Sequence, residues 1–192
     1  MIFDFDLLTI AILFVIYIIV DIIVYIKNRD IIWIIFSFIA FVYLANVIKL
    51  TLFPFYIGIS FPNNLVASVN IIPFKNCLNK TSVLNILMTI PYGIGVQFIY
   101  KFKSKRGLFA SGVCFSILIE MLQLVEALVQ GGFSIRIIDI NDVIFNSIGV
   151  VIGLLLLKLI SLIFLKYENK DLNIFWQYVK QRAASIFRYF LK

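Results

Sequence analysis

Long apolar stretches separated by short polar segments organise this chain. Five of them hold about 20 mostly apolar residues, the length that an α-helix needs to cross a hydrocarbon core of roughly 30 Å. They are Leu7–Ile26, Ile31–Phe55, Thr81–Tyr100, Gly107–Val129 and Asp142–Leu165. Apolar and polar residues do not alternate along them, as they would in a transmembrane β-barrel, and a helix bonds its own backbone within lipid. The pattern predicts an all-α integral membrane protein with five transmembrane helices.

The C-terminal segment from Asp171 to Lys192 has a different period. Its apolar residues recur at steps of three and four, at Leu172, Phe175, Trp176, Val179, Ala183, Ile186, Phe187 and Phe190. Most of its cations lie off that stripe, which predicts an amphipathic interfacial helix that anchors the tail to the membrane. A docking surface for a partner protein is the alternative. We therefore divide the chain into an N-terminal membrane segment (1–48), a membrane domain (49–165) and an amphipathic tail (166–192).

The composition agrees with a membrane protein and excludes several other classes. Of the 192 residues, 62% are hydrophobic and 14% are charged, whereas soluble domains have about 45–50% and about 25%. A soluble enzyme, a nucleic-acid-binding domain and a disordered tail are therefore excluded. The chain has no histidine, and Cys77 and Cys114 lack CxxC spacing, so neither His-based catalysis nor a metal or other cofactor site is indicated.

The placement of Lys and Arg predicts the orientation. The loop after the first stretch holds Lys27 and Arg29, the loop 101–106 after the third holds four cations, and the tail after the fifth is also basic. With five spans, all three segments lie on one side, which the positive-inside rule assigns to the cytoplasm. We expect a multi-pass protein of the bacterial plasma membrane with its N-terminus outside and its C-terminus cytoplasmic. The same bias explains the net charge of +7 without a nucleic-acid partner.

Polar residues within the later spans gather near the predicted outer face. Ionisable side chains in a membrane are costly and persist where they face a cavity or a partner. Glu120 and Gln123 share one helical face, and a second stripe runs through Arg136, Asp139, Asp142, Asn146, Gly149 and Gly153. We expect the Glu120–Gln123 face to lie against the Asp142–Asn146 face, and the glycine pair to let another helix approach closely. The candidate pocket residues are Asn70, Lys75, Asn85, Tyr92, Glu120, Gln123, Arg136, Asp139, Asp142 and Asn146.

Two further segments allow more than one interpretation. The mildly apolar loop from Gly58 to Lys80 either stays at the surface or re-enters the outer leaflet under a cover of protein. In the third span, Pro91 with Gly93 and Gly95 predicts either a tolerated kink or an opened helix with freed carbonyls.

The order and spacing of several short motifs are similar to a known family. The motifs are Asn70-Ile-Ile-Pro73-Phe74, Asn85-Ile-Leu87, Pro91-Tyr-Gly93, Glu120-x-x-Gln123 and Arg136-x-x-Asp139-x-x-Asp142-x-x-x-Asn146-x-x-Gly149, with Gly153 following. From about Lys49 to Ile160 the chain resembles the VanZ-like family. The resemblance implies a bacterial plasma-membrane protein, and the family's namesake gives resistance to the lipoglycopeptide antibiotic teicoplanin. It assigns no catalytic residue.

Three functions remain open at this point. As a binding protein, the chain would hold an amphiphile, either a lipoglycopeptide antibiotic or a lipid-linked cell-wall precursor. Arg136 and Lys75 would meet phosphate or carboxylate, while Asp139, Asp142 and Glu120 would meet amines or hydroxyls. As a membrane enzyme, it would use Glu120 and Asp142 as a carboxylate pair, or hold a divalent cation on the two aspartates. As a scaffold, it would use the same side chains to join helices.

Overall fold

The computed structural model describes residues 2–28, 30–57, 69–75, 79–102, 104–130, 138–164 and 172–190. Its long helices are α1 (Leu7–Asn28), α2 (Ile31–Leu52), α3 (Lys80–Ile99), α4 (Lys105–Val129) and α5 (Ile140–Phe164). All five are long and apolar enough to cross a membrane. A sixth helix, α6 (Ile174–Phe190), occupies the predicted tail. The expected all-α membrane fold is confirmed.

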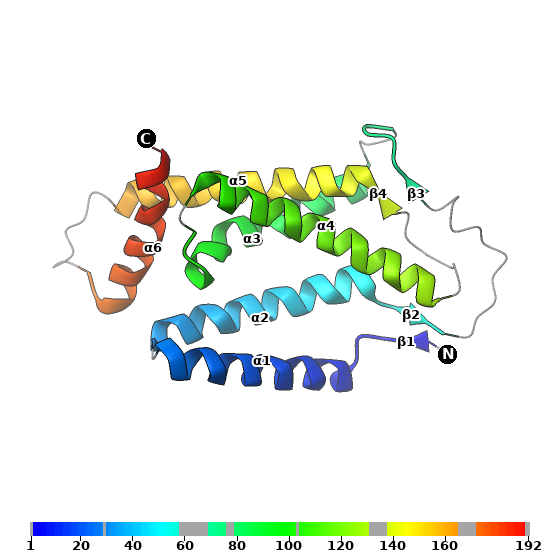
Figure 1. The fold of residues 1–192 in the computed structure, drawn as a ribbon, viewed down its shortest axis with the longest axis horizontal. Helices are drawn as coiled ribbons and strands as arrows, with labels where there is room; N and C mark the ends of the chain where they lie inside the picture. Colours follow the sequence, from blue (N-terminus) through cyan, green and yellow to red (C-terminus); the bar gives the residue numbers. More distant parts are fainter. Residues whose placement is uncertain are drawn as a thin grey trace.

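The five long helices run along the long axis of the molecule, and α6 lies across one end of them (Figure 1). Four two-residue strands lie at the opposite end with the N-terminus. Strand β1 (Ile2–Phe3) pairs antiparallel with β2 (Phe55–Tyr56), and β3 (Val69–Asn70) pairs parallel with β4 (Ile138–Asp139). We call this end the strand end and the other the α6 end. The strands matter because β3 and β4 join the loop after α2 to the start of α5.

Glycines bring α3 and α5 into backbone contact at the centre of the fold. A Cβ on Gly153 would collide with the carbonyl oxygen of Ile90 and come within 2.9 Å of the Gly93 Cα. Thr89 of α3 also donates through Oγ1 to the Asn146 carbonyl oxygen of α5 at 2.7 Å. The close helix approach expected at Gly149 and Gly153 is confirmed, and the helix that approaches is α3.

The expected pairing of the polar faces of α4 and α5 holds for Glu120, which lies near Asp142, but Asn146 and Gln123 also bond to other helices. Helix α4 contacts α5 where Gly112 lies against the Val150 side chain, while Asn146 turns its carbonyl to α3. Gln123 donates through Nε2 to the Thr51 carbonyl oxygen of α2 at 3.3 Å. The reason is that the glycine stripe of α5 admits α3 most closely, which leaves the Gln123 side of α4 to face α2.

Helix α3 continues without interruption from Lys80 to Ile99, with Pro91 inside it. The opened-helix alternative is therefore wrong. Three residues before this proline, the Met88 carbonyl oxygen accepts a hydrogen bond of 3.0 Å from the Tyr43 hydroxyl of α2. Such support from neighbouring helices is how membrane helices tolerate proline.

Part of the apolar stripe of α6 is buried against the helix bundle, and part is exposed. Val179 and Ala183 are buried together with Phe98 of α3 and Leu157 of α5. Trp176, by contrast, is 43% exposed. Helix α6 thus closes the end of the bundle with one part of its stripe and leaves another part exposed.

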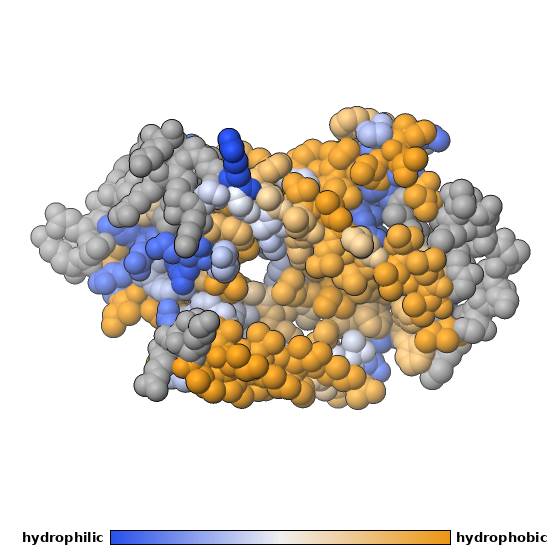
Figure 2. Space-filling view, in the orientation of Figure 1, coloured by the Kyte–Doolittle hydropathy of each residue, from blue (hydrophilic) through white to orange (hydrophobic). Residues whose placement is uncertain are grey.

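The outside of the bundle is apolar along its length. Figure 2 shows apolar side chains over most of the visible face, with hydrophilic ones mainly at the α6 end and in smaller groups near the strand end. On α1, Leu7 is 82% and Ile26 is 70% exposed. Such a surface would be unfavourable in water but matches acyl chains. Most of the segment predicted to re-enter the membrane, including residues 58–68 and 76–78, lies outside the described residues.

Candidate functional site

A cavity of about 730 Å³ lies at the strand end, where the polar residues of the sequence motifs converge. We call it the strand-end cavity. Its lining comes from α2, the start of α3, α4 and the start of α5, and comprises Leu50, Thr51, Asn79, Thr81, Leu84, Asn85, Leu87, Met88, Gln123, Asp139 and Asp142. Four of these, Asn85, Gln123, Asp139 and Asp142, belong to the candidate residues. The lining therefore places carboxyl and amide groups beside an apolar wall.

Asp139 is positioned by the pairing of β3 with β4, which sets Asn70 beside it. Asn70 donates through Nδ2 to Asp139 Oδ1 at 2.9 Å, and the Asn141 backbone N–H donates to the same oxygen at 2.8 Å. The backbone N–H of Asp139 in turn donates to Glu120 Oε2 of α4 at 3.3 Å. Two hydrogen bonds thus hold the Asp139 carboxyl on the cavity wall, and a third fixes its backbone to α4.

Asn141 holds the loop segment 69–75 on the bundle, a role that the sequence pattern did not indicate. It is 2% exposed, accepts a hydrogen bond from the Phe74 backbone N–H at 2.6 Å and donates to the Lys75 carbonyl oxygen at 3.1 Å. The stripe of three- and four-residue steps passes from Asp139 to Asp142 and omits it. The position of Asn141 between Asp139 and Asp142 could have indicated this role, because an Asn that becomes buried needs hydrogen-bond partners.

Three carboxyl groups lie close together at this end. Glu120, Asp139 and Asp142 are near enough for their charges to repel one another. Glu120 is only 7% exposed and stands behind Asp139, outside the cavity lining. Among the described residues, no group of three His, Cys, Asp or Glu side chains is arranged to hold a metal ion.

Two side chains of the lining carry buried polar atoms without a hydrogen bond of standard geometry. Gln123 Oε1 forms no hydrogen bond with any described residue. Asn85 Nδ2 forms none of standard geometry, although the Asn85 amide lies close to the Asp142 carboxyl. Leaving such a group unsatisfied costs about 1–3 kcal/mol. Native proteins satisfy nearly all buried polar groups, so these two amides are the side chains of the lining that keep unused hydrogen-bonding capacity.

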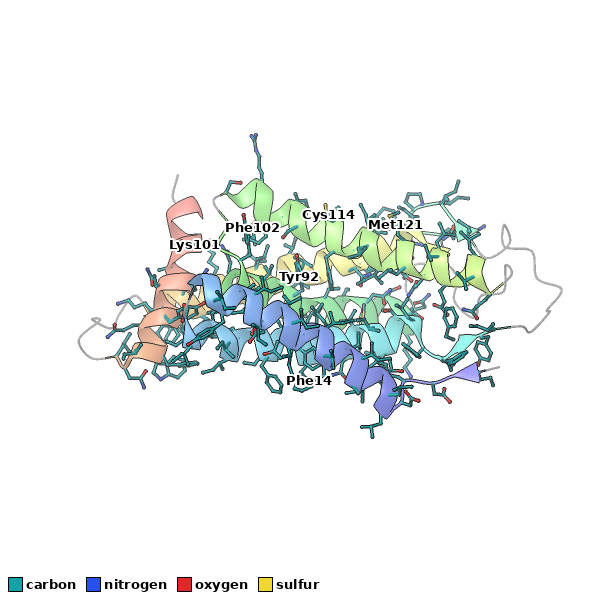
Figure 3. The ribbon with its side chains drawn as sticks, turned by 60° about the horizontal axis from the view of Figure 1, so that its bottom comes forward. Phe14, Tyr92, Lys101, Phe102, Cys114 and Met121 are labelled. Atoms are coloured by element: carbon teal, nitrogen blue, oxygen red, sulfur yellow. The ribbon has the colours of Figure 1, made fainter. Side chains whose placement is uncertain are left out.

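The other candidate residues have different positions. Tyr92 stacks on Phe115 of α4 at 4.3 Å between ring centroids, near the middle of the molecule and outside the lining (Figure 3). Asn146 is buried between α5 and α3, with its Oδ1 also unpartnered among the described side chains. Lys75 is exposed and contributes only its carbonyl oxygen. Arg136 lies outside the described residues.

Five apolar helices with acids and amides around a cavity at one end define a multi-pass helical membrane protein with a polar cavity at one end of its bundle. The profile of the VanZ/LLP1 family matches residues 8–162, most of the chain. The protein belongs to the VanZ/LLP1 family, and the resemblance found in the sequence is confirmed. The match begins in α1, well before Lys49, where that resemblance began. No curated protein and no solved structure matches the chain.

Proposed function

We propose that the strand-end cavity binds the polar head of an amphiphile at the extracytoplasmic face of the bacterial plasma membrane. Through this binding the protein would contribute to resistance to lipoglycopeptides such as teicoplanin. The observation that carries the proposal is the convergence of four polar side chains on one cavity with an apolar wall: Asn85, Gln123, Asp139 and Asp142. The association of VanZ-like proteins with glycopeptide resistance supports the same conclusion.

The chemistry of the lining suits a ligand with an amine- or hydroxyl-bearing head and an apolar tail. Carboxyl oxygens of Asp139 and Asp142 accept hydrogen bonds from ammonium or sugar hydroxyl groups, and such charge-assisted bonds are the stronger ones. Leu84, Leu87 and Met88 supply the apolar wall. The antibiotic itself and a lipid-linked cell-wall precursor both have this construction.

The proposed orientation rests on the distribution of charge between the two ends. Lys101 and Arg106 lie near the α6 end, where α3 ends and α4 begins, whereas Asp4 and Asp6 precede α1 at the strand end. The positive-inside rule then assigns the strand end, and with it the cavity, to the extracytoplasmic side.

Cysteine labelling tests this orientation. Cys77→Ser and Cys114→Ser remove both native cysteines, and Asp4→Cys or Gln181→Cys adds one at either end. An impermeant maleimide should label the Asp4→Cys protein in intact cells and the Gln181→Cys protein only after lysis. The opposite pattern would contradict the orientation.

Removal of charge from the lining tests the binding function. Asp139→Asn and Asp142→Asn keep the shape of each side chain, and we expect each to lower protection against teicoplanin several-fold in a susceptible host. Asp4→Asn is the matched control, because it removes an exposed carboxyl from the same end outside the cavity. Expression and melting temperature are measured alongside. Full protection by both lining variants, at normal expression, would overturn the proposal.

A second candidate function is an enzyme that acts on a lipid substrate through a carboxyl pair. The proximity of Glu120 to Asp142 favours it, since neighbouring carboxyls are suited to acid–base catalysis. The two functions differ in their products. An enzyme would convert a labelled lipid-linked precursor, and Glu120→Gln would stop that conversion while leaving binding to the cavity intact. A binding protein would retain the unchanged ligand.

A further inference from the structure

A second cavity lies between α1 and α2, separate from the strand-end cavity. It measures about 590 Å³ and shares no lining residue with the first. We call it the hairpin groove. Its lining comprises Leu13, Ile16, Tyr17, Val20, Asp21, Val24, Trp33, Ser37, Ala40, Phe41, Leu44, Ala45, Ile48, Ile99 and Tyr100. In this apolar setting, one side chain is acidic and several are aromatic.

Helical spacing gathers the polar and aromatic groups of the groove. Tyr17 and Asp21 are four residues apart on α1, and Trp33, Ser37 and Phe41 follow steps of four on α2, so each set shares one face. The two faces meet: Ser37 donates through Oγ to Asp21 Oδ1 at 2.6 Å, and the Tyr17 and Phe41 rings stack at 4.8 Å. The Asp21 carboxyl therefore lies among aromatic rings.

The environment of Asp21 explains which ligand the groove would take. A carboxyl within a transmembrane helix is costly and is retained where it has a functional partner. Ser37 supplies one hydrogen bond but no positive charge. Tyr17, Trp33 and Phe41 line the same groove, and aromatic rings attract cations. Trp33 is held in place because its Nε1 donates to the Ile99 carbonyl oxygen at 3.1 Å.

We propose that the hairpin groove binds a lipophilic organic cation, with the positive centre near Asp21 and the apolar groups along α1 and α2. The carboxyl and the rings favour positive charge together, whereas an anion of the same shape would meet repulsion from Asp21. This proposal stands apart from the function of the strand-end cavity, because it uses other residues on other helices.

Two ions of nearly the same shape and opposite charge provide the test. The protein has two tryptophans, so Trp176→Phe leaves Trp33 as a single fluorescent probe in the groove. In purified protein in detergent, tetraphenylphosphonium should bind saturably by calorimetry and change the Trp33 emission, and tetraphenylborate should do neither. Asp21→Asn, which keeps an oxygen acceptor for Ser37, should weaken cation binding tenfold or more.

Matched variants separate the role of charge from that of packing. Ser37→Ala removes the hydrogen bond but keeps the Asp21 carboxyl, so its preference for the cation should persist. Asp142→Asn removes a carboxyl from the strand-end cavity and should leave the Trp33 response unchanged. Equal binding of both ions, or undiminished cation binding by Asp21→Asn, would overturn the proposal. If Asp21→Asn unfolds, loss of cation binding in Asp21→Glu, which keeps the charge, would overturn it as well.

Discussion

Asn70 and Asp139, 69 positions apart in the chain, are joined by a hydrogen bond of 2.9 Å from Nδ2 to Oδ1. This bond and the β3–β4 pairing attach the loop after α2 to the start of α5. They place Asp139 on the wall of the strand-end cavity. The shape of the proposed binding site thus depends on a contact between two segments that lie outside the transmembrane helices.

Exchanging the donor and acceptor of this pair should reveal its contribution. Asn70→Asp sets two carboxyls against each other, and we expect it to lower the stability by about 1–3 kcal/mol. Combining it with Asp139→Asn restores a donor and an acceptor, so the double variant should recover part of the loss in a thermal melt. Strictly additive effects of the two substitutions would show that the side chains do not interact.

The glycine contact between α3 and α5 predicts that the effect of a Gly→Ala substitution on stability depends strongly on which glycine is replaced. A Cβ on Gly153 would meet the backbone of α3, whereas a Cβ on Gly95 would have nothing within 4 Å. Gly153→Ala should therefore destabilise the protein by about 1–3 kcal/mol, the usual cost of overpacking. Gly95→Ala is the control on the same pair of helices and should leave the melting temperature unchanged or raise it. Equal effects would contradict the observed packing.

Asn85 should show opposite effects on stability and on binding. Its Nδ2 makes no hydrogen bond of standard geometry with the described residues, so Asn85→Leu removes a poorly satisfied polar group and should raise the melting temperature. The same change removes a donor from the cavity and should reduce protection against teicoplanin. Leu87→Ala, on the apolar part of the lining, serves as a comparison that leaves the polar groups intact. A variant that is less stable but fully protective would contradict the role given to Asn85.

The attachment of α6 should weaken at high pH. Tyr178 donates its hydroxyl to the Phe98 carbonyl oxygen at 2.9 Å, and burial raises the pKa of Tyr178 above its ordinary value. Its contribution is therefore full below about pH 10, the pKa of an unfolded tyrosine, and is lost as the pH rises through the raised value. Tyr178→Phe should cost about 0.5–1.5 kcal/mol near neutral pH. The difference between the two proteins should shrink above pH 10 in melts recorded across that range.

The sequence pattern predicted the fold well because each transmembrane helix satisfies its own backbone. The five apolar stretches agree with α1 to α5 within a few residues at most ends, and the amphipathic tail agrees with α6. Gly149 and Gly153 indicated a close helix contact for the same local reason: a residue without a Cβ leaves room for another backbone. Such properties belong to single segments and need no knowledge of their neighbours.

The candidate site was predicted in part. Asp139, Asp142, Gln123 and Asn85 do line one cavity, since their depth in the membrane followed from the spans. Tyr92 was placed with them by depth alone, but its ring turns toward Phe115. Asn141 was missed because its partners, the backbone groups of Phe74 and Lys75, come from a distant loop.

By itself, then, the sequence determined how many long helices the chain forms, roughly where they begin and end, and at which end of each helix the charged groups lie. Hydrophobic length and helical period are enough for that in a bilayer. Only the tertiary structure decided which faces meet: α5 against α3, Gln123 against α2, Asp21 against Ser37. Helix faces in lipid are selected by close packing and a few hydrogen bonds between segments far apart in the chain, and those contacts exist only once the bundle is assembled.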